Sequence, residues 1–275
     1  MTDISSIPAP VIPNVLTIAG SDPSGGAGIQ ADLKTFSALG AYGSSVITAL
    51  TAQNTRGVTG VHPVPAEFIA AQLETLLDDV RIDAVKIGMV ASREVAEVIR
   101  AALTRRRPRW VVLDPVMVAK SGDILVDDTG IRAVREVLVP LADLITPNLP
   151  EAAVLLDAPA PGSRNEMQAL APALRALGAG ATLLKGGHLA GEECPDLLIT
   201  ADEALWVEGA RVDTANLHGT GCTLSSAITA RLALGDALPE AVARAKRWLG
   251  EALEASRRLD VGQGRGPVHH FHAWW

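Results

Sequence analysis

Short runs of apolar residues alternate with longer stretches in which apolar residues recur at helical spacing, and this order repeats along most of the chain. The short runs predict buried strands over 15–19, 44–50, 84–87, 110–113, 144–146 and 181–184. The longer stretches predict helices over 29–39, 67–80, 92–105, 129–138, 165–177, 222–234 and 239–259, and a further short helix that opens at Glu151. Strands and helices in alternation are typical of an α/β fold, so we expect a mostly parallel central sheet flanked by helices.

Other segments depart from this alternation. The runs 197–200 and 204–207 predict an antiparallel pair at the edge of the sheet, and the polar segment 56–64 predicts a short flap or edge hairpin. Residues 1–14 are rich in proline and predict a disordered leader. We expect residues 15–275 to form a single domain, because they contain no evident linker or internal repeat.

Glycine, acid, amide and lysine residues gather directly after the predicted strands. A glycine-rich loop, 20–28, follows the first strand, and Asp114, Asn148 with Glu151, and Lys185 follow later ones. In open α/β sheets ligands bind in the crevice beyond the carboxyl ends of the strands. This placement therefore favours an active site over scattered surface polarity.

Composition narrows the kind of ligand and location. Apolar residues make up 48% of the chain, aromatic residues only 3%, and the formal net charge is −7. A nucleic-acid or anionic-membrane surface requires a basic patch, so we expect neither partner, and a small anionic substrate would be met locally. The chain has two cysteines, no signal peptide at its start and no apolar run long enough to span a bilayer, which predicts a cytoplasmic protein.

The segment Gly219-Thr220-Gly221-Cys222 precedes a predicted helix and carries the strongest chemical signal. A glycine turn at a helix start presents unpaired N–H groups and the positive end of the helix dipole, which together bind phosphate. The same dipole lowers the pKa of a thiol, so Cys222 is the candidate base, with Gly219, Thr220 and Gly221 as the anion cradle. A glycine loop with a buried cysteine is the alternative interpretation.

Phosphoryl transfer requires positioning and neutralisation of charge, and the strand-end residues can supply both. Lys185 can reach a phosphate as a point charge, and Asn148 can hold a water or a phosphate oxygen. Asp114 and Glu151 are suited to Mg²⁺, directly or through water. Each acid could instead serve only at a helix start or in a loop, and Lys185 could be a solvated strand-end lysine.

Several motifs resemble those of the hydroxymethylpyrimidine/phosphomethylpyrimidine kinase family of thiamine biosynthesis. These motifs are Val15–Asp32, Asn148-Leu149-Pro150-Glu151, Gly219-Thr220-Gly221-Cys222 and Gly266–His272. The resemblance implies a ribokinase-like three-layer α/β sandwich, a homodimer, and ATP and Mg²⁺ as cofactors. It implies phosphorylation of 4-amino-5-hydroxymethyl-2-methylpyrimidine and then of its monophosphate. It also implies that Cys222 stands where many sugar and nucleoside kinases of the superfamily carry an aspartate base.

The resemblance further implies that Gly20, Asp32, Gln53, Met89 and Val116 form the pyrimidine site. A side-chain amide such as Gln53 both donates and accepts, so it can pair with an aminopyrimidine edge, and Met89 offers a polarizable contact to a ring. Asp32 could instead be an exposed or capping acid in its helix, and Gln53 an ordinary turn amide.

Some questions remain open at this level. A pyridoxine or pyridoxal kinase of the same superfamily and a non-catalytic pyrimidine-binding regulator are the alternatives to this function. The loop Lys120-Ser121-Gly122 is a candidate lid that excludes water during transfer. The tail histidines His269, His270 and His272 are interpreted as structural, because no spaced partner cluster accompanies them.

Overall fold

The computed structural model describes residues 11–117 and 127–275. Residues 1–10 of the expected leader and the candidate lid Lys120-Ser121-Gly122 therefore lie outside the described residues. The first strand begins at Asn14, at the end of the expected leader, where the backbone N–H of Asn14 donates to Asp83 Oδ2 at 2.9 Å.

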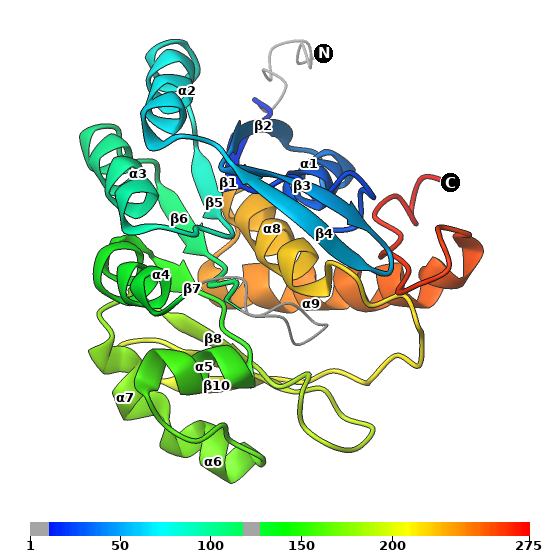
Figure 1. Ribbon diagram of the computed structural model, residues 1–275. Helices are drawn as coiled ribbons and strands as arrows, with labels where there is room; N and C mark the ends of the chain where they lie inside the picture. The colour runs from blue at the N-terminus through cyan, green and yellow to red at the C-terminus, as the bar shows by residue number, and fades with distance from the viewer. Residues whose placement is uncertain (1–10, 118–126) are drawn as a thin grey trace, which may run out of the picture.

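Within the described ranges, eight strands form the central sheet in the order β10-β9-β8-β7-β6-β5-β1-β2 (Figure 1). Their bounds are β1 Asn14–Ala19, β2 Tyr42–Ile47, β5 Ala84–Ile87, β6 Trp110–Leu113, β7 Leu144–Ile145, β8 Thr182–Lys185, β9 Asp196–Ile199 and β10 Ala204–Val207. The six neighbouring strands β8, β7, β6, β5, β1 and β2 are parallel, whereas β9 is antiparallel to both β8 and β10. The expected parallel sheet and its antiparallel edge pair are both confirmed.

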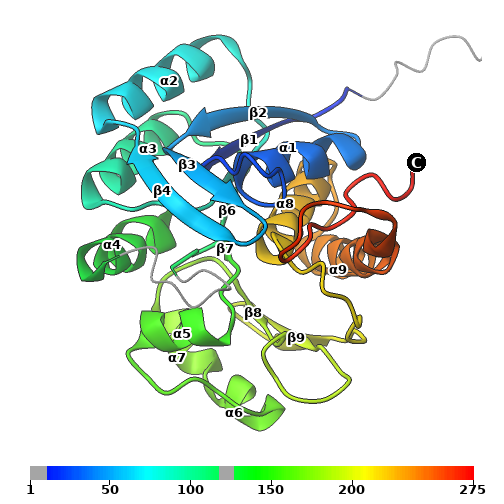
Figure 2. The ribbon, with the colours of Figure 1, turned by 45° about the vertical axis from the view of Figure 1, so that its right-hand side comes forward.

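One predicted strand, 44–50, is wrong as a single element. β2 ends at Ile47, and the chain enters a separate hairpin made of β3 (Ala49–Asn54) and β4 (Gly57–Pro63). Thr48 marks the change, because its N–H donates to Ala19 O at 2.9 Å while its carbonyl accepts from Val64 N at 3.0 Å. The predicted flap at 56–64 is confirmed as the second strand of this hairpin, whose tip lies beside the C-terminal segment (Figure 2).

Helices cover both faces of the sheet, which confirms the three-layer sandwich (Figure 1). One layer contains α1 Gly28–Ala38, α8 Thr220–Ala233 and α9 Leu238–Ala255. The other layer contains α2 Ala66–Asp79, α3 Arg93–Arg105, α4 Asp128–Ala133, α5 Leu149–Leu156, α6 Arg164–Ala169 and α7 Ala171–Ala176. Adjacent strand residues point to opposite layers, so Leu16 packs with Ile99 of α3, whereas Val15 packs with Phe36 of α1.

Two predicted helices are divided in the structure. The helix expected over 165–177 is split into α6 and α7, and Pro172 lies in the first turn of α7, where it lacks an N–H to continue a helix from α6. The helix expected over 129–138 begins as α4 and continues as a π-helical segment, Val134–Leu138. Neither change moves the strand ends that carry the polar side chains.

α8 is the central helix of its layer. Its residues from Thr223 to Ala230 are all buried, and the helix contacts α1, α9, β1, β5 and β6. Apart from Arg231 in its last turn, α8 carries only apolar, small or hydroxyl-bearing residues, as expected of a helix enclosed by other elements. This packing fixes the N-terminus of α8, and therefore the turn Gly219–Cys222, against the ends of the strands.

Candidate active site

The carboxyl ends of neighbouring strands are aligned at one edge of the sheet. Ile18 of β1 is level with Ile87 of β5, and Ile87 is level with Leu113 of β6. The next residues continue this register, because Asp114 N donates to Ile87 O at 2.8 Å and Thr146 N donates to Leu113 O at 2.9 Å. The parallel register therefore brings the polar residues that follow separate strands to a common edge.

Asp114 and Lys185 form the centre of this edge. Lys185 Nζ lies 3.1 Å from Asp114 Oδ1, which also accepts from Thr146 Oγ1 at 3.1 Å, while Asp114 Oδ2 accepts from Ser225 Oγ at 3.3 Å. Burial would raise the pKa of Asp114, but Lys185 and Lys86 outweigh it and hold this pKa below its usual value. Burial would lower the pKa of Lys185, and Asp114 with Glu151 raises it instead. An ionised pair results.

Glu151 and Asn148 join at the start of α5. Asn148 Oδ1 accepts from Glu151 N at 2.9 Å, and Glu151 Oε2 accepts from Asn148 N at 2.8 Å, which is a reciprocal capping box. The helix-start role that the sequence left open for Glu151 is therefore present. Burial, with a further contribution from the Asp114 charge, also raises the pKa of Glu151 to about 7.

Asp114 and Glu151 are suited to a magnesium ion whose other ligands are water and the phosphate oxygens of a substrate. Within residues 11–117 and 127–275, no group of three or more His, Cys, Asp or Glu side chains could hold a metal by itself. Mg²⁺ retains several waters and is usually bound by one or two carboxylates together with phosphate oxygens. The raised pKa of Glu151 beside Asp114 indicates a place where a cation would relieve charge repulsion.

The turn before α8 lies against the Asp114–Lys185 pair. A Cβ added to Gly221 would lie 3.4 Å from Lys185 Nζ and 3.7 Å from Asp114 Oδ2. Gly219 has φ of +73°, and a Cβ there would overlap the carbonyl of Gly26, so this position requires glycine. No side chain of the described chain caps the N-terminus of α8. The predicted anion cradle and Lys185 are therefore brought together.

The thiol of Cys222 differs from its prediction. The expected low pKa is wrong, because burial raises the pKa of Cys222 to about 11, and the charges of Asp32 and Asp114 act in the same direction. Lys86 and the N–H of Gly28 favour the thiolate but do not outweigh burial. The thiol therefore holds its proton at neutral pH.

Asp32 lies in a buried ion pair with Lys86. Both side chains are fully buried, and Lys86 Nζ lies 2.9 Å from Asp32 Oδ2. The carboxylate also accepts from Thr17 Oγ1 at 2.6 Å and from Ser226 Oγ at 2.7 Å. Asp32 is therefore neither exposed nor a helix cap, and its contact with a substrate stays a prediction.

Lys86 was missed by the sequence interpretation, although it carried a signal. It is the one charged residue in the apolar strand Ala84–Ile87, and the Asp32 charge raises its pKa despite complete burial. A lysine inside a strand that is buried on both faces requires a partner. The sequence could have suggested a buried acid, but not which one.

The remaining predicted pocket residues follow separate strands or lie on the β3–β4 hairpin. A Cβ on Gly20 would lie 3.2 Å from Met89 Cε, so these two residues are neighbours. Gln53, on β3, has its amide 3.5 Å from His218 Nε2. Val116 follows Asp114 and donates its N–H to the Asp114 carbonyl at 2.8 Å. The pyrimidine-binding role of all five residues stays a prediction.

His218 connects the segment before α8 to the glycine-rich loop 20–28. Its Nε2 lies 2.7 Å from Asp22 Oδ2, and hydrogen bonds from His218 and Ser24 outweigh burial and lower the pKa of Asp22 to about 2. Asp22 also accepts from Ala27 N at 2.8 Å, so it organises the glycine-rich loop. The sequence interpretation did not single out this acid.

The tail histidines pack against helices. His269 and His270 are buried, and His270 Nε2 lies 3.0 Å from Thr223 Oγ1 of α8. The ring of His272 lies 5.4 Å from that of Trp248 on α9. These contacts agree with a structural tail rather than a metal site.

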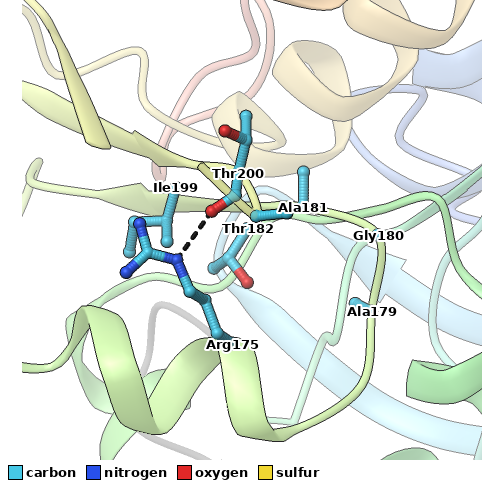
Figure 3. A pocket seen from close by; sticks show the side chains of 8 residues that line it. Arg175, Ala179, Gly180, Ala181, Thr182, Ile199 and Thr200 are labelled. Carbon is cyan, nitrogen blue, oxygen red and sulfur yellow. Dashed lines mark hydrogen bonds between the residues drawn. The ribbon is translucent and has the colours of Figure 1, made fainter. Parts of the chain in front are cut away.

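A pocket of about 270 Å³ lies at the opposite end of β8 (Figure 3). Thr182, which lines it, begins β8, whereas Lys185 ends that strand at the candidate site. The guanidinium of Arg175 already donates to Thr200 O at 2.7 Å. We therefore do not assign this pocket to the active site.

A three-layer α/β sandwich with a glycine turn, lysine and paired carboxylates beyond its parallel strands defines a ribokinase-like small-molecule kinase. The family model described as phosphomethylpyrimidine kinase matches residues 22–269, and the chain belongs to this family. No helix in the described part of the chain is long and apolar enough to cross a membrane.

Relatives from several bacteria match nearly the whole chain. The hydroxymethylpyrimidine/phosphomethylpyrimidine kinase of Salmonella typhimurium is 55% identical over 262 residues, which cover 95% of this chain and 98% of the relative. The enzyme of the same description from Rhizobium meliloti is 55% identical over 260 residues, with 94% and 97% covered. These matches confirm the family resemblance and the assignment as a kinase.

Solved structures show the same fold. Phosphomethylpyrimidine kinase from Clostridium difficile is 44% identical, with a TM-score of 0.78 and coverage of 87% of this chain and 99% of that one. An ADP complex of pyridoxal kinase from Bacillus subtilis is 37% identical, with a TM-score of 0.88 and coverage of 96% and 99%. The fold is thus shared by a phosphomethylpyrimidine kinase and a pyridoxal kinase.

Proposed function

We propose that this kinase transfers a phosphoryl group from ATP to 4-amino-5-hydroxymethyl-2-methylpyrimidine, and then transfers a second one to the monophosphate. In the first step the substrate hydroxyl forms a bond to the γ-phosphorus of ATP as the bond to ADP breaks, and a proton is released. In the second step a phosphate oxygen of the monophosphate is the nucleophile. Membership of the phosphomethylpyrimidine kinase family supports this substrate.

The single structural observation that carries the proposal is the meeting of Lys185, Asp114 and the Gly219–Cys222 turn at one edge of the sheet. The N–H groups of the turn and the Lys185 ammonium would bind the transferring phosphoryl group and stabilise its charge. Asp114 and Glu151 would hold Mg²⁺, whose charge offsets that of the phosphates. Asn148 would lie beside the phosphates, because it bridges to Lys185 in the extended sheet.

We assign Cys222 a positioning role rather than that of a free thiolate base. A thiol with a pKa of about 11 donates a hydrogen bond at neutral pH and does not accept a proton. Phosphoryl transfer through a loose transition state needs little deprotonation of the nucleophile before the bond forms. The nucleophile must instead be held in line with the γ-phosphorus. The Cys222 side chain and the nearby Gly28 backbone would orient the hydroxymethyl oxygen in this way.

Gly20, Gln53, Met89, Val116 and Asp32 are proposed as the pyrimidine site. Met89 would contact the ring face, and Gln53 would pair with the amino group and the adjacent ring nitrogen. The buried Asp32 would contribute through its pair with Lys86 beneath the pocket. The homodimer, the cytoplasmic location and the organisation as a leader followed by one domain stay predictions.

Pyridoxal is the second candidate substrate, because the pyridoxal kinase from Bacillus subtilis has the higher TM-score of the two structures compared above. We would incubate the purified protein with Mg²⁺-ATP and the hydroxymethylpyrimidine, with pyridoxal in a parallel reaction, and separate the products by mass. Monophosphate followed by diphosphate is the expected result. Strong pyridoxal turnover with no pyrimidine diphosphate would overturn the proposal in favour of a vitamin B6 kinase. If neither the pyrimidine nor pyridoxal is phosphorylated, both candidate functions are contradicted.

A further inference from the structure

Lys185 and Asp196 face each other at the end of the β8–β9 pair, where they are directly opposed in the antiparallel register. Leu183 and Leu198, the opposed pair two residues away on the same face, lie in the core shared with α9, so both polar side chains project toward that layer. The Cβ atoms of directly opposed residues are about 4.5–5.5 Å apart. Asp196 is therefore close enough to compete with Asp114 for the Lys185 ammonium.

Lys246 of α9 occupies Asp196 instead. Its Nζ lies 2.5 Å from Asp196 Oδ2 and donates to Cys194 O at 2.6 Å, and the two charged side chains are only 12% and 5% exposed. A Cβ on Gly209 would lie 2.6 Å from Lys246 Cε, so the lysine stem passes directly over a glycine. The carboxylate opposite Lys185 is thus already paired with another cation.

The other oxygen of Asp196 holds the backbone directly after Lys185. Asp196 Oδ1 accepts from Gly186 N at 2.9 Å, at the point where the ladder between β8 and β9 ends. A Cβ on Gly186 would overlap Pro195 O, so the chain leaves the strand in close contact with β9. Lys185 N itself donates to Pro147 O at 2.9 Å. The backbone N–H groups of Lys185 and of the next residue are therefore both held.

We propose that Asp196 and Lys246 form a positioning pair for Lys185. Stability alone is a weak reason for a buried ion pair, because apolar residues of similar volume are often no less stabilising. Here the carboxylate fixes the backbone that carries Lys185, and Lys246 prevents that carboxylate from drawing the Lys185 ammonium away from Asp114 and the phosphate. This inference rests on the proposed function, because it takes Lys185 as the lysine that binds the transferring phosphoryl group.

The test compares kcat/KM of variants on the substrate that the wild type phosphorylates. Lys246→Met leaves Asp196 free to attract Lys185, and kcat/KM should fall roughly 10-fold or more, because misplacement of a group by about 1 Å can cost roughly 100-fold. Adding Asp196→Asn, which keeps an acceptor for Gly186 but has no charge, should restore most of the lost activity. Arg231→Met, which removes the cation of a partly buried ion pair at the far end of α8, is the control and should leave kcat/KM unchanged.

A double-mutant cycle with Lys185→Met separates positioning from general destabilisation. If the pair acts through Lys185, Lys246→Met should cause no further loss of kcat/KM in the Lys185→Met background. The same loss in both backgrounds, wild-type activity in Lys246→Met, or an equal loss in Arg231→Met would overturn the inference. A wild-type protein that phosphorylates neither the hydroxymethylpyrimidine nor pyridoxal would instead overturn the proposed function.

A second pair of variants keeps the test decisive if Lys246→Met does not fold. Asp196→Asn and Asp196→Ala, each combined with Lys246→Met, both lack the ion pair and differ in whether an acceptor remains for Gly186. The variant with alanine should be roughly 10-fold or more less active than the variant with asparagine, since only its Lys185 backbone is released. Equal activity of the two would contradict the role of Asp196.

The hydrogen bond to Gly186 can be measured in the wild type without turnover. Amide hydrogen exchange followed by NMR should show that the Gly186 N–H is protected, because Asp196 holds it inside the fold. Exchange of this N–H at the rate of an unfolded chain would show that Asp196 does not anchor the residue after Lys185. That result would overturn the inference whichever substrate the kinase uses.

Discussion

Lys185 Nζ and Asp114 Oδ1 lie 3.1 Å apart, and the two side chains are 13% and 2% exposed. The pair joins the end of β8 to the end of β6 across β7, directly against the turn that opens α8. A lysine so placed can face a phosphate on one side and a carboxylate on the other. It is the best-supported contact of the proposed phosphate site.

We expect Lys185→Met to lower kcat/KM roughly 100-fold, as loss of a group that stabilises transition-state charge does in other enzymes. Asp114 keeps its hydrogen bond from Thr146 and the nearby positive charge of Lys86, so the fold should survive. Release of ADP in a coupled assay measures the loss. Arg100→Met, on the exposed surface of α3, is the control for the removal of a positive charge. Equal activity of the two variants would exclude Lys185 from the site.

We expect the stability of the metal-free protein to depend on pH through Glu151. Its pKa in the fold is about 7, above its usual 4.5, so the stability that its protonated form contributes is present below pH 4.5 and is lost as the pH rises through 7. Without metal, Glu151→Gln should therefore gain thermal stability relative to the wild type between pH 5 and pH 8.

Magnesium should reverse that difference. Because the metal binds the ionised carboxylate, Mg²⁺ should raise the melting temperature of the wild type more at pH 8 than at pH 5. Glu151→Gln should respond weakly at both values. Differential scanning fluorimetry measures these shifts, with Glu254→Gln on the exposed side of α9 as the control. An identical magnesium response in all three proteins would remove Glu151 from the metal site.

The positions of the strand-end residues were predictable, because the register of parallel strands determines where each strand ends relative to its neighbours. Once the apolar runs were recognised as parallel strands, Asp114, Asn148 and Lys185 had to emerge at one edge. The division of 44–50 into a strand and a hairpin was not predictable, because the apolar run continues across Thr48 without a turn residue. Residues Ala49–Asn54 leave the central sheet because they pair with β4. Tertiary pairing, not local pattern, determines that element.

The electrostatic character of side chains was less accessible from the sequence. A helix N-terminus suggested a low pKa for Cys222, yet the pKa depends on how deeply α8 is buried, which the local motif does not encode. The resemblance assigned Asp32 to the pyrimidine site, but no local motif indicated that it pairs with Lys86, more than fifty residues away in the chain. Such choices are made by the packing of several elements at once.

The Asp32–Lys86 pair predicts a sharp asymmetry between single and double substitutions. Lys86→Met should destabilise the protein by about 3–5 kcal/mol, because it leaves a buried carboxylate without its counter-ion. Asp32→Asn combined with Lys86→Met should recover much of this loss, since no buried charge remains. Urea unfolding measures both values. A double variant no more stable than Lys86→Met would show that the charge pairing is not what this site requires.

Cys222 should react slowly with alkylating reagents. In a Cys194→Ser background Cys222 is the only cysteine, so its modification by iodoacetamide can be followed by mass. Because only the thiolate reacts, the rate should still be rising at pH 10, rather than levelling off near the ordinary pKa of 9.0. A rate that is already at its plateau at pH 7 would indicate a thiolate in the fold, as the helix position alone suggested.

The two phosphorylation steps together test what Cys222 does. The first step uses a neutral alcohol, which must be oriented and must lose its proton, whereas the second uses a phosphate oxygen that is already charged. Cys222→Ala should therefore lower the rate of the first step more than that of the second, and Cys222→Ser, which keeps a hydrogen-bond donor, should lose less than Cys222→Ala. Single-turnover assays started from each substrate separate the steps. Equal losses in both steps would mean that Cys222 supports the phosphate-binding turn that both reactions share, because the turn binds the phosphoryl group that is transferred in each step.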